Sequence, residues 1–353
     1  MASVVSTGTA DAPFKISQAD LKEFIQQLFT GSDLDVNRLI SVFDNSEISD
    51  RHISVSPEWL KSDHTFKERS VLFRETAIEL SKQAVIAALQ SAGAAPADIS
   101  NIIYVTSTGI MTPTLDALLF NELGFSKHVK RTPLWGLGCA GGAAGLSRAM
   151  EYTRAFPGEN ALLVALELCS LTFQRNDMTK SNIVAASLFS DGAACAVICG
   201  SDSPLMPKGR AEIIDSFSTI YSDSLDVMGW EIVESGFRVI FSRDIPVIVK
   251  ELVKPNIEEF LFKHSLSIDD IAYYVTHPGG LKVINSYEES LGLERGKLDL
   301  SRKVLREHGN MSSPSVLYVL DEFLKTSPVP GKFGLLSALG PGFSSELVLF
   351  RTV

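Results

Sequence analysis

The sequence is poor in cysteine, contains no long hydrophobic run and carries no excess of positive charge. None of its cysteines forms a C-x-x-C pair, and no histidine lies at zinc-ligand spacing from them. A chain of 353 residues can bury a large core without disulfide bonds, so we expect free thiols and a cytoplasmic protein. The cysteines are Cys139, Cys169, Cys195 and Cys199.

Other absences narrow the class of protein further. No apolar run reaches the length of about 18 residues that a membrane-spanning helix requires, so we expect no integral membrane segment. Residues 1–14 lack the basic region followed by an apolar region that marks a secretion signal. The net charge of −10 disfavours nucleic acid or an anionic membrane as the main partner.

What the sequence does contain is typical of a large globular α/β protein. Hydrophobic residues make up 45% of it and charged residues 21%, which supplies a substantial core. At about 100–200 residues per domain, the length suggests two units. The segment 201–210 is the best boundary, and we assign residues 1–205 to an N-terminal half and 206–353 to a C-terminal half.

The order of predicted elements repeats along the chain. A long helix precedes an apolar strand at 102–106, and a second helix precedes a strand at 271–276. Both strands end in Tyr-Val-Thr, and each is followed at nearly the same distance by a glycine and a helix start. This repetition indicates a duplicated αβ unit whose sheet is covered by helices. Further apolar strands close the halves, at 162–168 and 193–198 in the first and at 333–337 and 347–350 in the second.

Cys139 lies in the most informative segment, WGLGCAGGAAG at 135–145. The preceding glycines permit a tight turn from strand to helix, and the small residues after Cys139 leave space beside its sulfur. A cysteine at a helix N-terminus favours the thiolate, because the helix dipole is positive there. A buried structural cysteine is the alternative interpretation. A phosphate-binding loop is disfavoured, since no Gly-Lys-Ser/Thr follows.

His277 and Asn310 are the other candidates for chemistry. His277 ends an apolar strand, where α/β folds meet their ligands, and glycines follow it. Asn310 follows Gly309 at the position that Cys139 occupies in the first half, although a helix N-cap would also explain an asparagine there. A Cys, a His and an Asn that converge form a working set for acyl transfer. His308 is the closest rival histidine, but its polar context is typical of the surface.

At these residues the chain resembles the type III polyketide synthases of the chalcone and stilbene synthase superfamily. The resemblance rests on Gly138-Cys139 with its small-residue helix, HPGG at 277–280, GNMSS at 309–313 and GPG at 340–342. It covers nearly the whole chain. The segment ELCSLTF at 167–173 is similar to the bacterial alkylpyrone and alkylresorcinol type. The implied fold is α/β, the thiolase fold, with two αβαβα halves.

The resemblance also implies a mechanism that these residues support. The Cys139 thiolate, paired with protonated His277, takes an acyl group from acyl-CoA. Malonyl-CoA then loses CO2, and donors from His277 and Asn310 hold the enolate that attacks the acyl-cysteine. An asparagine amide suits this role because it donates without titrating. No metal or redox cofactor and no carrier protein is required.

Several pocket residues follow from the resemblance alone. Phe189 corresponds to a gatekeeper phenylalanine, although Ser190 replaces the glycine that usually follows it. Val239 falls at the second gatekeeper position, where a small side chain would widen the pocket for long acyl chains. Cys169 and Thr172 correspond to residues that line the cavity. Leu339 replaces the aromatic residue of the family's late glycine-rich loop.

The resemblance further implies CoA contacts and a homodimer. Arg38, Gly279 and Gly280 are the expected CoA-binding residues. Arg38 corresponds to one of the basic residues with which the family binds CoA, whereas Ser41 and Asn45 replace two others. Thr112 lies in the loop 109–113, which in this family reaches toward the partner subunit's active site. We therefore expect a twofold-symmetric dimer.

Three alternatives remain open at this point. A β-ketoacyl-acyl-carrier-protein synthase III shares the fold and the Cys, His and Asn, but it performs one condensation and needs a carrier protein. A catalytically silent binding subunit of the same fold would not need all three polar residues. A Cys-His-Asn hydrolase would not show this duplicated order of elements.

Overall fold

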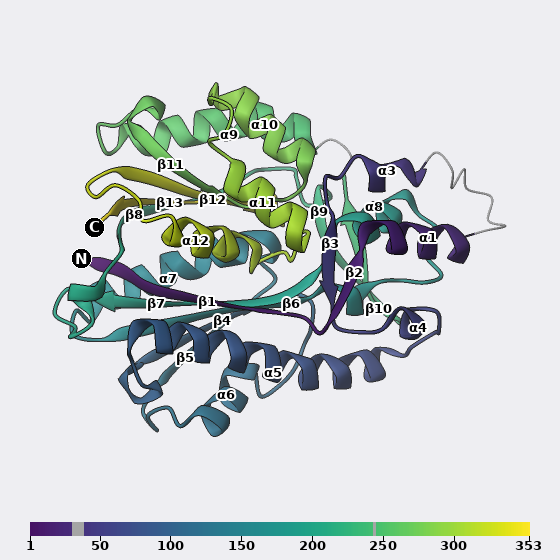
Figure 1. Ribbon diagram of the computed structural model, residues 1–353, viewed down its shortest axis with the longest axis horizontal. Helices are drawn as coiled ribbons and strands as arrows, with labels where there is room; N and C mark the ends of the chain where they lie inside the picture. The colour runs from purple at the N-terminus through teal and green to yellow at the C-terminus, as the bar shows by residue number, and fades with distance from the viewer. Residues whose placement is uncertain (30–38, 243–244) are drawn as a thin grey trace.

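The computed structural model describes residues 1–29, 39–242 and 245–353, and its largest feature is a 9-stranded mixed sheet (Figure 1). The strand order is β11-β12-β13-β8-β1-β7-β6-β4-β5. β1 pairs antiparallel with both β7 and β8, so it joins the two parts of the sheet. The strands are β1 (Ala2–Asp11), β4 (Asn101–Thr106), β5 (Lys130–Trp135), β6 (Asn160–Leu168), β7 (Asp191–Gly200), β8 (Ala211–Ile220), β11 (Ile271–Thr276), β12 (Phe333–Gly340) and β13 (Ser344–Thr352).

Helices cover the outer faces of the sheet and fill the space between its two parts. α5 and α6 lie against the strands of the N-terminal half, and α9 and α10 lie against those of the C-terminal half (Figure 1). The helices are α1 (Gln18–Leu28), α3 (Ser41–Asp44), α4 (Pro57–Leu60), α5 (Phe66–Ala92), α6 (Leu115–Leu123), α7 (Gly141–Ala155), α8 (Lys180–Leu188), α9 (Ile245–Phe262), α10 (Leu281–Leu291), α11 (Asp299–His308) and α12 (Ser315–Lys325).

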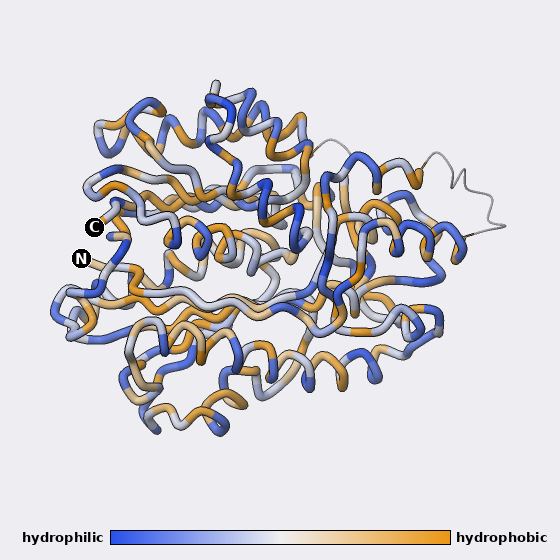
Figure 2. Tube along the Cα trace, viewed as in Figure 1, coloured by the Kyte–Doolittle hydropathy of each residue, from blue (hydrophilic) through white to orange (hydrophobic). Residues whose placement is uncertain are grey.

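The two central helices, α7 and α12, form the middle layer of this arrangement (Figure 1). A single buried cluster joins both helices to strands from both halves, with Ala143, Val316 and Leu336 among its members. Hydrophobic residues concentrate on the central strands and the inward sides of the helices (Figure 2). The layered fold predicted for the thiolase type is therefore present, and the predicted boundary at 205 falls in the connection between β7 and β8.

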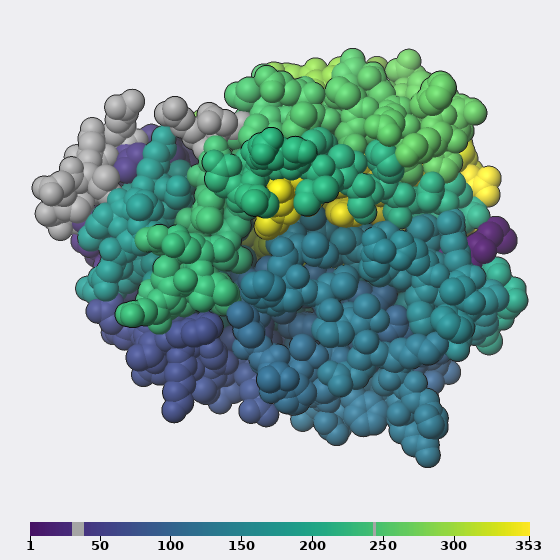
Figure 3. Space-filling model, turned by 180° about the vertical axis from the view of Figure 1, so that it is seen from behind, coloured from purple at the N-terminus to yellow at the C-terminus, as the bar shows by residue number. Residues whose placement is uncertain are grey.

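Two small hairpins stand at one end of the large sheet. β2 (Phe14–Ser17) pairs with β3 (Asp50–Ile53), and β9 (Met228–Val233) pairs with β10 (Gly236–Phe241). Together with α1, α3, α4 and α8 they form the end of the molecule farthest from both termini (Figure 1). Seen from behind, atoms near the C-terminus lie in a hollow where the two halves meet (Figure 3).

The elements that the sequence predicts are present at or near the predicted positions. The first helix begins after Ser17, whose side chain accepts a hydrogen bond from the backbone N–H of Asp20. The long helix α5 ends at Gly93, which adopts a left-handed conformation. In the part of the chain that the structure describes, every helix is too short or too polar to cross a bilayer.

Candidate active site

The three residues predicted for acyl transfer line one internal chamber. Cys139, His277 and Asn310 all border it, and it holds about 380 Å³ of empty space. Leu339 and Gly279, which the sequence also places near the site, are part of the same wall. The remaining lining residues are mostly apolar: Met228, Phe241, Ile245, Val283 and Tyr287. The chamber therefore gathers three polar groups in surroundings that exclude water.

Cys139 reaches the chamber because the chain turns sharply between β5 and α7. Gly138 has φ +48°, a left-handed conformation that glycine adopts without strain, and its N–H donates to Ser107 Oγ at 2.8 Å. One turn later, α7 lies against the loop that precedes α12. A Cβ atom on Gly142 would lie 2.4 Å from the carbonyl oxygen of Ser313, so a glycine is needed for this approach. The small-residue pattern thus brings the helix that follows Cys139 against the loop that contains Asn310.

His277 follows β11 directly, at the carboxyl end of the strand. Its backbone N–H donates to the carbonyl oxygen of Ser337 at 2.8 Å, which anchors it to the neighbouring strand β12. Neither ring nitrogen has a hydrogen-bond partner among the described residues. Burial lowers the pKa of His277 to about 3. The imidazole is therefore neutral, and both of its nitrogens remain available to a substrate.

Asn310 is held by its backbone and its side chain together. Its N–H donates to the carbonyl of Leu188, and its own carbonyl accepts from Ser190, so the loop pairs with the segment around Phe189. Its side-chain amide donates to the carbonyl oxygen of Gly279 at 3.1 Å, and its Oδ1 accepts from the N–H of Ser312. The N-cap position of α12 belongs to Pro314, so Asn310 is not a helix cap.

Burial shifts the pKa of both Cys139 and His277 against the charged form, which opposes the predicted thiolate and imidazolium pair in the chamber without substrate. Cys139 Sγ donates to Ser312 Oγ at 3.4 Å, and burial raises the pKa of the thiol to about 11. The helix dipole favours the thiolate, but removing a charge from water opposes it more strongly in this apolar chamber.

Sequence reasoning missed two residues that shape the site. Ser312 has φ +61°, a conformation that is uncommon outside glycine, and this places its hydroxyl beside Cys139. Glu167 is fully buried and accepts hydrogen bonds from the N–H of Ser107 and from the hydroxyl of Ser313. Glu167 thus links the cysteine's turn to the asparagine's loop. A glutamate in the apolar run LLVALEL at 162–168 was the signal for it.

A pH-dependent stability follows from the position of Glu167. Burial raises its pKa to about 7, against 4.5 ordinarily, so the folded protein holds a proton that the unfolded chain has released. This stabilisation is fully present below the ordinary pKa and is lost as the pH rises through the folded value. By linkage, its loss amounts to about 3 kcal/mol by pH 8.

Glu167→Gln should remove this dependence, because the amide does not titrate. The free energy of unfolding in urea, measured at several pH values between about 5 and 8, should fall more steeply for the unaltered protein than for the variant. Glu346 is also buried with a raised pKa, so Glu346→Gln serves as the matched control for a carboxyl away from the chamber. Parallel curves for Glu167→Gln and the unaltered protein would contradict the assignment.

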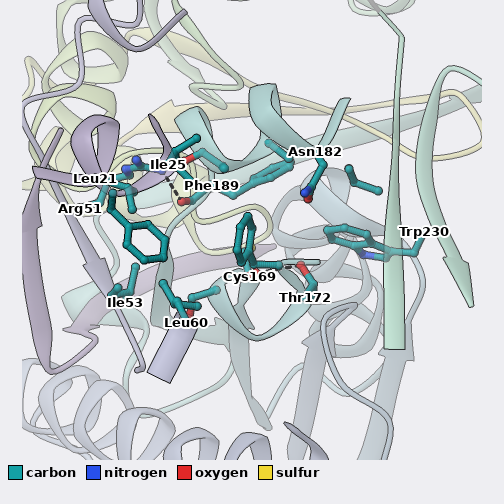
Figure 4. Close-up of a pocket in the computed structure, with 16 residues that line it drawn as sticks. Leu21, Ile25, Arg51, Ile53, Leu60, Cys169, Thr172, Asn182, Phe189 and Trp230 are labelled. Atoms are coloured by element: carbon teal, nitrogen blue, oxygen red, sulfur yellow. Dashed lines mark hydrogen bonds between the residues drawn. The ribbon is translucent and has the colours of Figure 1, made fainter. Parts of the chain in front are cut away.

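A larger apolar cavity lies beside the catalytic chamber, with about 540 Å³ of empty space. Phe189, Cys169, Thr172 and Val239, the residues that the resemblance assigns to the pocket, all line it. Figure 4 shows aliphatic side chains of α1, β3 and α4 on one wall and Trp230 of β9 on the other. The rest of the lining is Leu21, Phe24, Ile25, Arg51, Ile53, Leu60, Ser170, Phe173, Asn182, Ala185, Ala186 and Trp230.

A pair of phenylalanines stands between the two spaces. Phe189 lines the larger cavity, and its ring meets that of Phe241, which lines the catalytic chamber, at 6.2 Å between centroids. Phe237, Val239 and Phe241 lie at every second position of β10 and so share one face of the strand, yet each borders a different cavity. The small residue Val239 lines the larger cavity, while the aromatic Phe241 lines the chamber that holds Cys139.

The remaining predicted residues lie away from these two spaces. Thr112 is exposed, in a surface loop beside Trp135, whose indole N–H donates to the carbonyl of Gly109. Gly280 is buried at the start of α10, next to Gly279. Arg38, the predicted CoA contact, lies outside the described residues.

Two family models together match almost the whole chain. The model for the N-terminal domain of chalcone and stilbene synthases matches residues 1–203, and the model for their C-terminal domain matches residues 212–353. Among individual proteins, a putative chalcone synthase of Bacillus subtilis is 44% identical, covering 99% of this chain and 98% of the relative. A 1,3,6,8-tetrahydroxynaphthalene synthase of Streptomyces peucetius is 37% identical, covering 99% and 93%.

Solved structures agree with this assignment. The crystal structure of 1,3,6,8-tetrahydroxynaphthalene synthase from Streptomyces coelicolor, a bacterial type III polyketide synthase, superposes with a TM-score of 0.94 at 28% identity and covers 99% of both chains. The alternatives of a carrier-protein-dependent synthase, a silent subunit and a hydrolase are not favoured by these relatives. The chain belongs to the chalcone and stilbene synthase family and is a type III polyketide synthase, an acyltransferase.

Proposed function

We propose that this enzyme extends a long-chain fatty acyl-CoA with malonyl-CoA in repeated decarboxylative condensations and releases alkylpyrone or alkylresorcinol products. The observation that carries this proposal is the apolar cavity beside the catalytic chamber. Cys169, Thr172, Phe189 and Val239, the pocket residues that the family resemblance indicates, all line it. Its walls offer mostly aliphatic and aromatic surface, which suits an alkyl chain better than a polar starter.

Each catalytic residue has a distinct role in the proposed cycle. Cys139 Sγ attacks the thioester carbonyl, its proton passes to His277, and the CoA thiolate leaves with a proton from that imidazole. Malonyl-CoA then binds and loses CO2. His277 and the amide of Asn310 donate to the enolate oxygen, which is where charge develops. The enolate carbon attacks the acyl-cysteine carbonyl, and the bond to sulfur breaks, which frees the Cys139 thiolate and leaves the lengthened chain on CoA. For the next cycle Cys139 attacks this new thioester, and the CoA thiolate leaves and takes a proton from water.

The geometry supports these roles in two ways. His277 has both ring nitrogens without a partner among the described side chains and backbone groups, so it can accept and return a proton. The side-chain amide of Asn310 donates one hydrogen to the carbonyl oxygen of Gly279, and its Oδ1 accepts from the N–H of Ser312. These two bonds fix the side chain, so its second amide hydrogen can donate to a substrate without a rotamer change. No step of this cycle requires a metal, a redox cofactor or a carrier protein.

The names of relatives favour a second candidate. One relative is a 1,3,6,8-tetrahydroxynaphthalene synthase, and another is a 3,5-dihydroxyphenylacetyl-CoA synthase of Amycolatopsis balhimycina, at 32% identity over 98% of this chain. Both names point to aromatic products rather than alkyl ones. The two candidates differ in whether an alkyl starter fills the larger cavity.

A starter panel separates the two candidates. The enzyme is incubated with malonyl-CoA alone, with butanoyl-CoA, dodecanoyl-CoA and octadecanoyl-CoA, and with coumaroyl-CoA, and the products are identified by mass spectrometry. We expect the long alkyl starters to give the highest kcat/KM. Faster turnover with coumaroyl-CoA, or a product from malonyl-CoA alone that long starters do not suppress, would contradict the proposal.

Filling the cavity should shorten the preferred starter. Ala186 lines the cavity on α8, and Val184 lies on the same helix but outside the lining. Ala186→Phe should lower kcat/KM for octadecanoyl-CoA by more than about tenfold, because each methylene denied burial costs about 0.8 kcal/mol. Butanoyl-CoA should be affected little. Val184→Phe is the control, and an equal loss for both starters in Ala186→Phe would argue against this cavity as the acyl site.

We also propose that the enzyme acts as a twofold-symmetric homodimer. The loop 109–113 supports this, since Ile110 is 48% exposed and Thr112 is exposed beside the half-exposed Trp135. An apolar surface of this kind on a single chain is typical of a contact with another protein.

A further inference from the structure

Two histidines and an aspartate cluster near the loop of Asn310, and none of the three lines either cavity. One ligand atom from each of Asp11, His52 and His308 lies within 4.8 Å of the other two. His308 Nδ1 is 3.0 Å from Asp11 Oδ1, and His52 Nδ1 is 3.9 Å from the same oxygen. The three side chains come from the end of β1, from β3 and from the last residue of α11, so the cluster spans both halves of the chain.

The chemistry of this set is that of a transition-metal site. Two imidazoles and one carboxylate bind first-row divalent ions, with metal–ligand distances of about 2.0–2.2 Å. Such distances place neighbouring ligand atoms about 3.4 Å apart in a tetrahedral site. The two distances to Asp11 Oδ1 bracket this value, so small side-chain rotations would bring the ligands into range.

The surroundings prepare the three groups for an ion. His52 Nδ1 is buried and has no hydrogen-bond partner among the residues that the structure describes. Tyr318 Oη donates to Asp11 Oδ1 at 3.1 Å, which restricts the orientation of the carboxylate. The Asp11 side chain is 40% exposed, which leaves one side open for water as a fourth ligand.

A second His–Asp pair in the molecule provides a comparison for the cluster of Asp11, His52 and His308. His264 Nε2 lies 3.0 Å from Asp215 Oδ2, at similar exposure, but among the described residues no third ligand joins them. A hydrogen-bonded pair of one histidine and one aspartate therefore explains Asp11 and His308 but not the position of His52. The second imidazole, held at the same carboxylate with an unpartnered buried nitrogen, is what points to an ion.

We propose that Asp11, His52 and His308 bind one divalent first-row transition ion, with Zn2+ as the preferred occupant. The ion would tie the C-terminal end of α11 to β1 and β3. Asn310 follows His308 by two residues, and the backbone of His52 exchanges two hydrogen bonds with Ser190 Oγ, next to the segment that pairs with Asn310. The ion thus positions the loop of the catalytic amide without touching the substrate.

Cobalt titration tests this directly. The protein is treated with a chelator and titrated with Co2+ in the Cys139→Ala background, which removes the active-site thiol as a competing ligand. We expect visible d–d absorption that saturates at one equivalent per chain and is reversed by Zn2+. His308→Gln and His52→Gln should weaken binding at least tenfold, whereas His264→Gln should leave it unchanged. Equal binding by the His308→Gln and His264→Gln proteins would overturn the proposal.

Two further measurements cover the case in which the histidine variants fold poorly. In the unaltered protein, Cu2+ electron paramagnetic resonance should show couplings to two imidazole nitrogens that change when histidine is labelled with 15N. Zn2+ should also raise the Tm of the unaltered protein and of His264→Gln alike, because it binds only the folded chain. Coupling to a single imidazole, or no rise in Tm with Zn2+, would overturn the proposal.

Discussion

Replacing Cys139 by alanine should abolish both starter loading and polyketide formation. Among the described residues that line the chamber, Cys139 is the only one with a thiol, so only its sulfur can form a thioester with the starter. On incubation with a fatty acyl-CoA, the unaltered protein should gain the mass of one acyl group in intact-protein mass spectrometry. The Cys139→Ala protein should gain nothing.

Cys169 provides a matched control for this experiment. It is buried in the adjoining cavity, and burial raises the pKa of its thiol well above the ordinary value. An apolar cavity without a partnered base does not activate a thiol, so Cys169→Ala should load the starter as the unaltered protein does. An acyl mass on Cys139→Ala, or its loss in Cys169→Ala, would assign the nucleophile to a different residue.

The convergence of Cys139, His277 and Asn310 could be predicted because each lies at a turn with a strong local signal. A glycine directly precedes Cys139 and Asn310, and His277 directly follows an apolar strand and is followed by Pro278 and two glycines. The backbone conformation of such a turn determines the direction of the side chain locally, without help from residues distant in the sequence. The apolar strands could also be predicted from the sequence, because runs of Val, Ile and Leu of this length are typical of a buried sheet.

The central strand β1 could not be predicted from the sequence. Its segment ASVVSTGTAD is rich in small polar residues, although it pairs with both β7 and β8 at the centre of the sheet. The hydroxyl groups are satisfied by remote partners: Ser3 Oγ donates to the carbonyl of Ala211 and Ser6 Oγ to that of Ala88. A buried hydroxyl is favourable only with such a partner, and local sequence does not contain it.

The deep burial of Cys139 could not be predicted for a related reason. The helix dipole is a local property that the sequence reveals, whereas burial depends on residues from distant segments, such as Met228 and Leu339. The cluster of Asp11, His52 and His308 is likewise assembled from three segments that no local spacing connects. Long-range packing, rather than local propensity, determines both features.

Removing the Asn310 amide should separate the two half-reactions of the cycle. Loading requires the sulfur and a base, so Asn310→Ala should still acquire the acyl mass from a starter. Decarboxylation of malonyl-CoA requires donors to the enolate oxygen. The loss of one such donor costs about 2.7–4 kcal/mol, so decarboxylation and condensation should slow by about 100- to 1,000-fold. Asn310→Asp should be at least as slow, because a carboxylate repels the enolate.

Asn256 offers the control for losing a buried amide elsewhere. Its side chain donates to Ser345 Oγ and accepts from Thr219, in a part of α9 that does not line the catalytic chamber. Asn256→Ala should cost stability yet leave the rate of CO2 release from malonyl-CoA near that of the unaltered enzyme. If Asn310→Ala released CO2 at the unaltered rate, or failed to load the starter, the amide would not be the donor that holds the enolate.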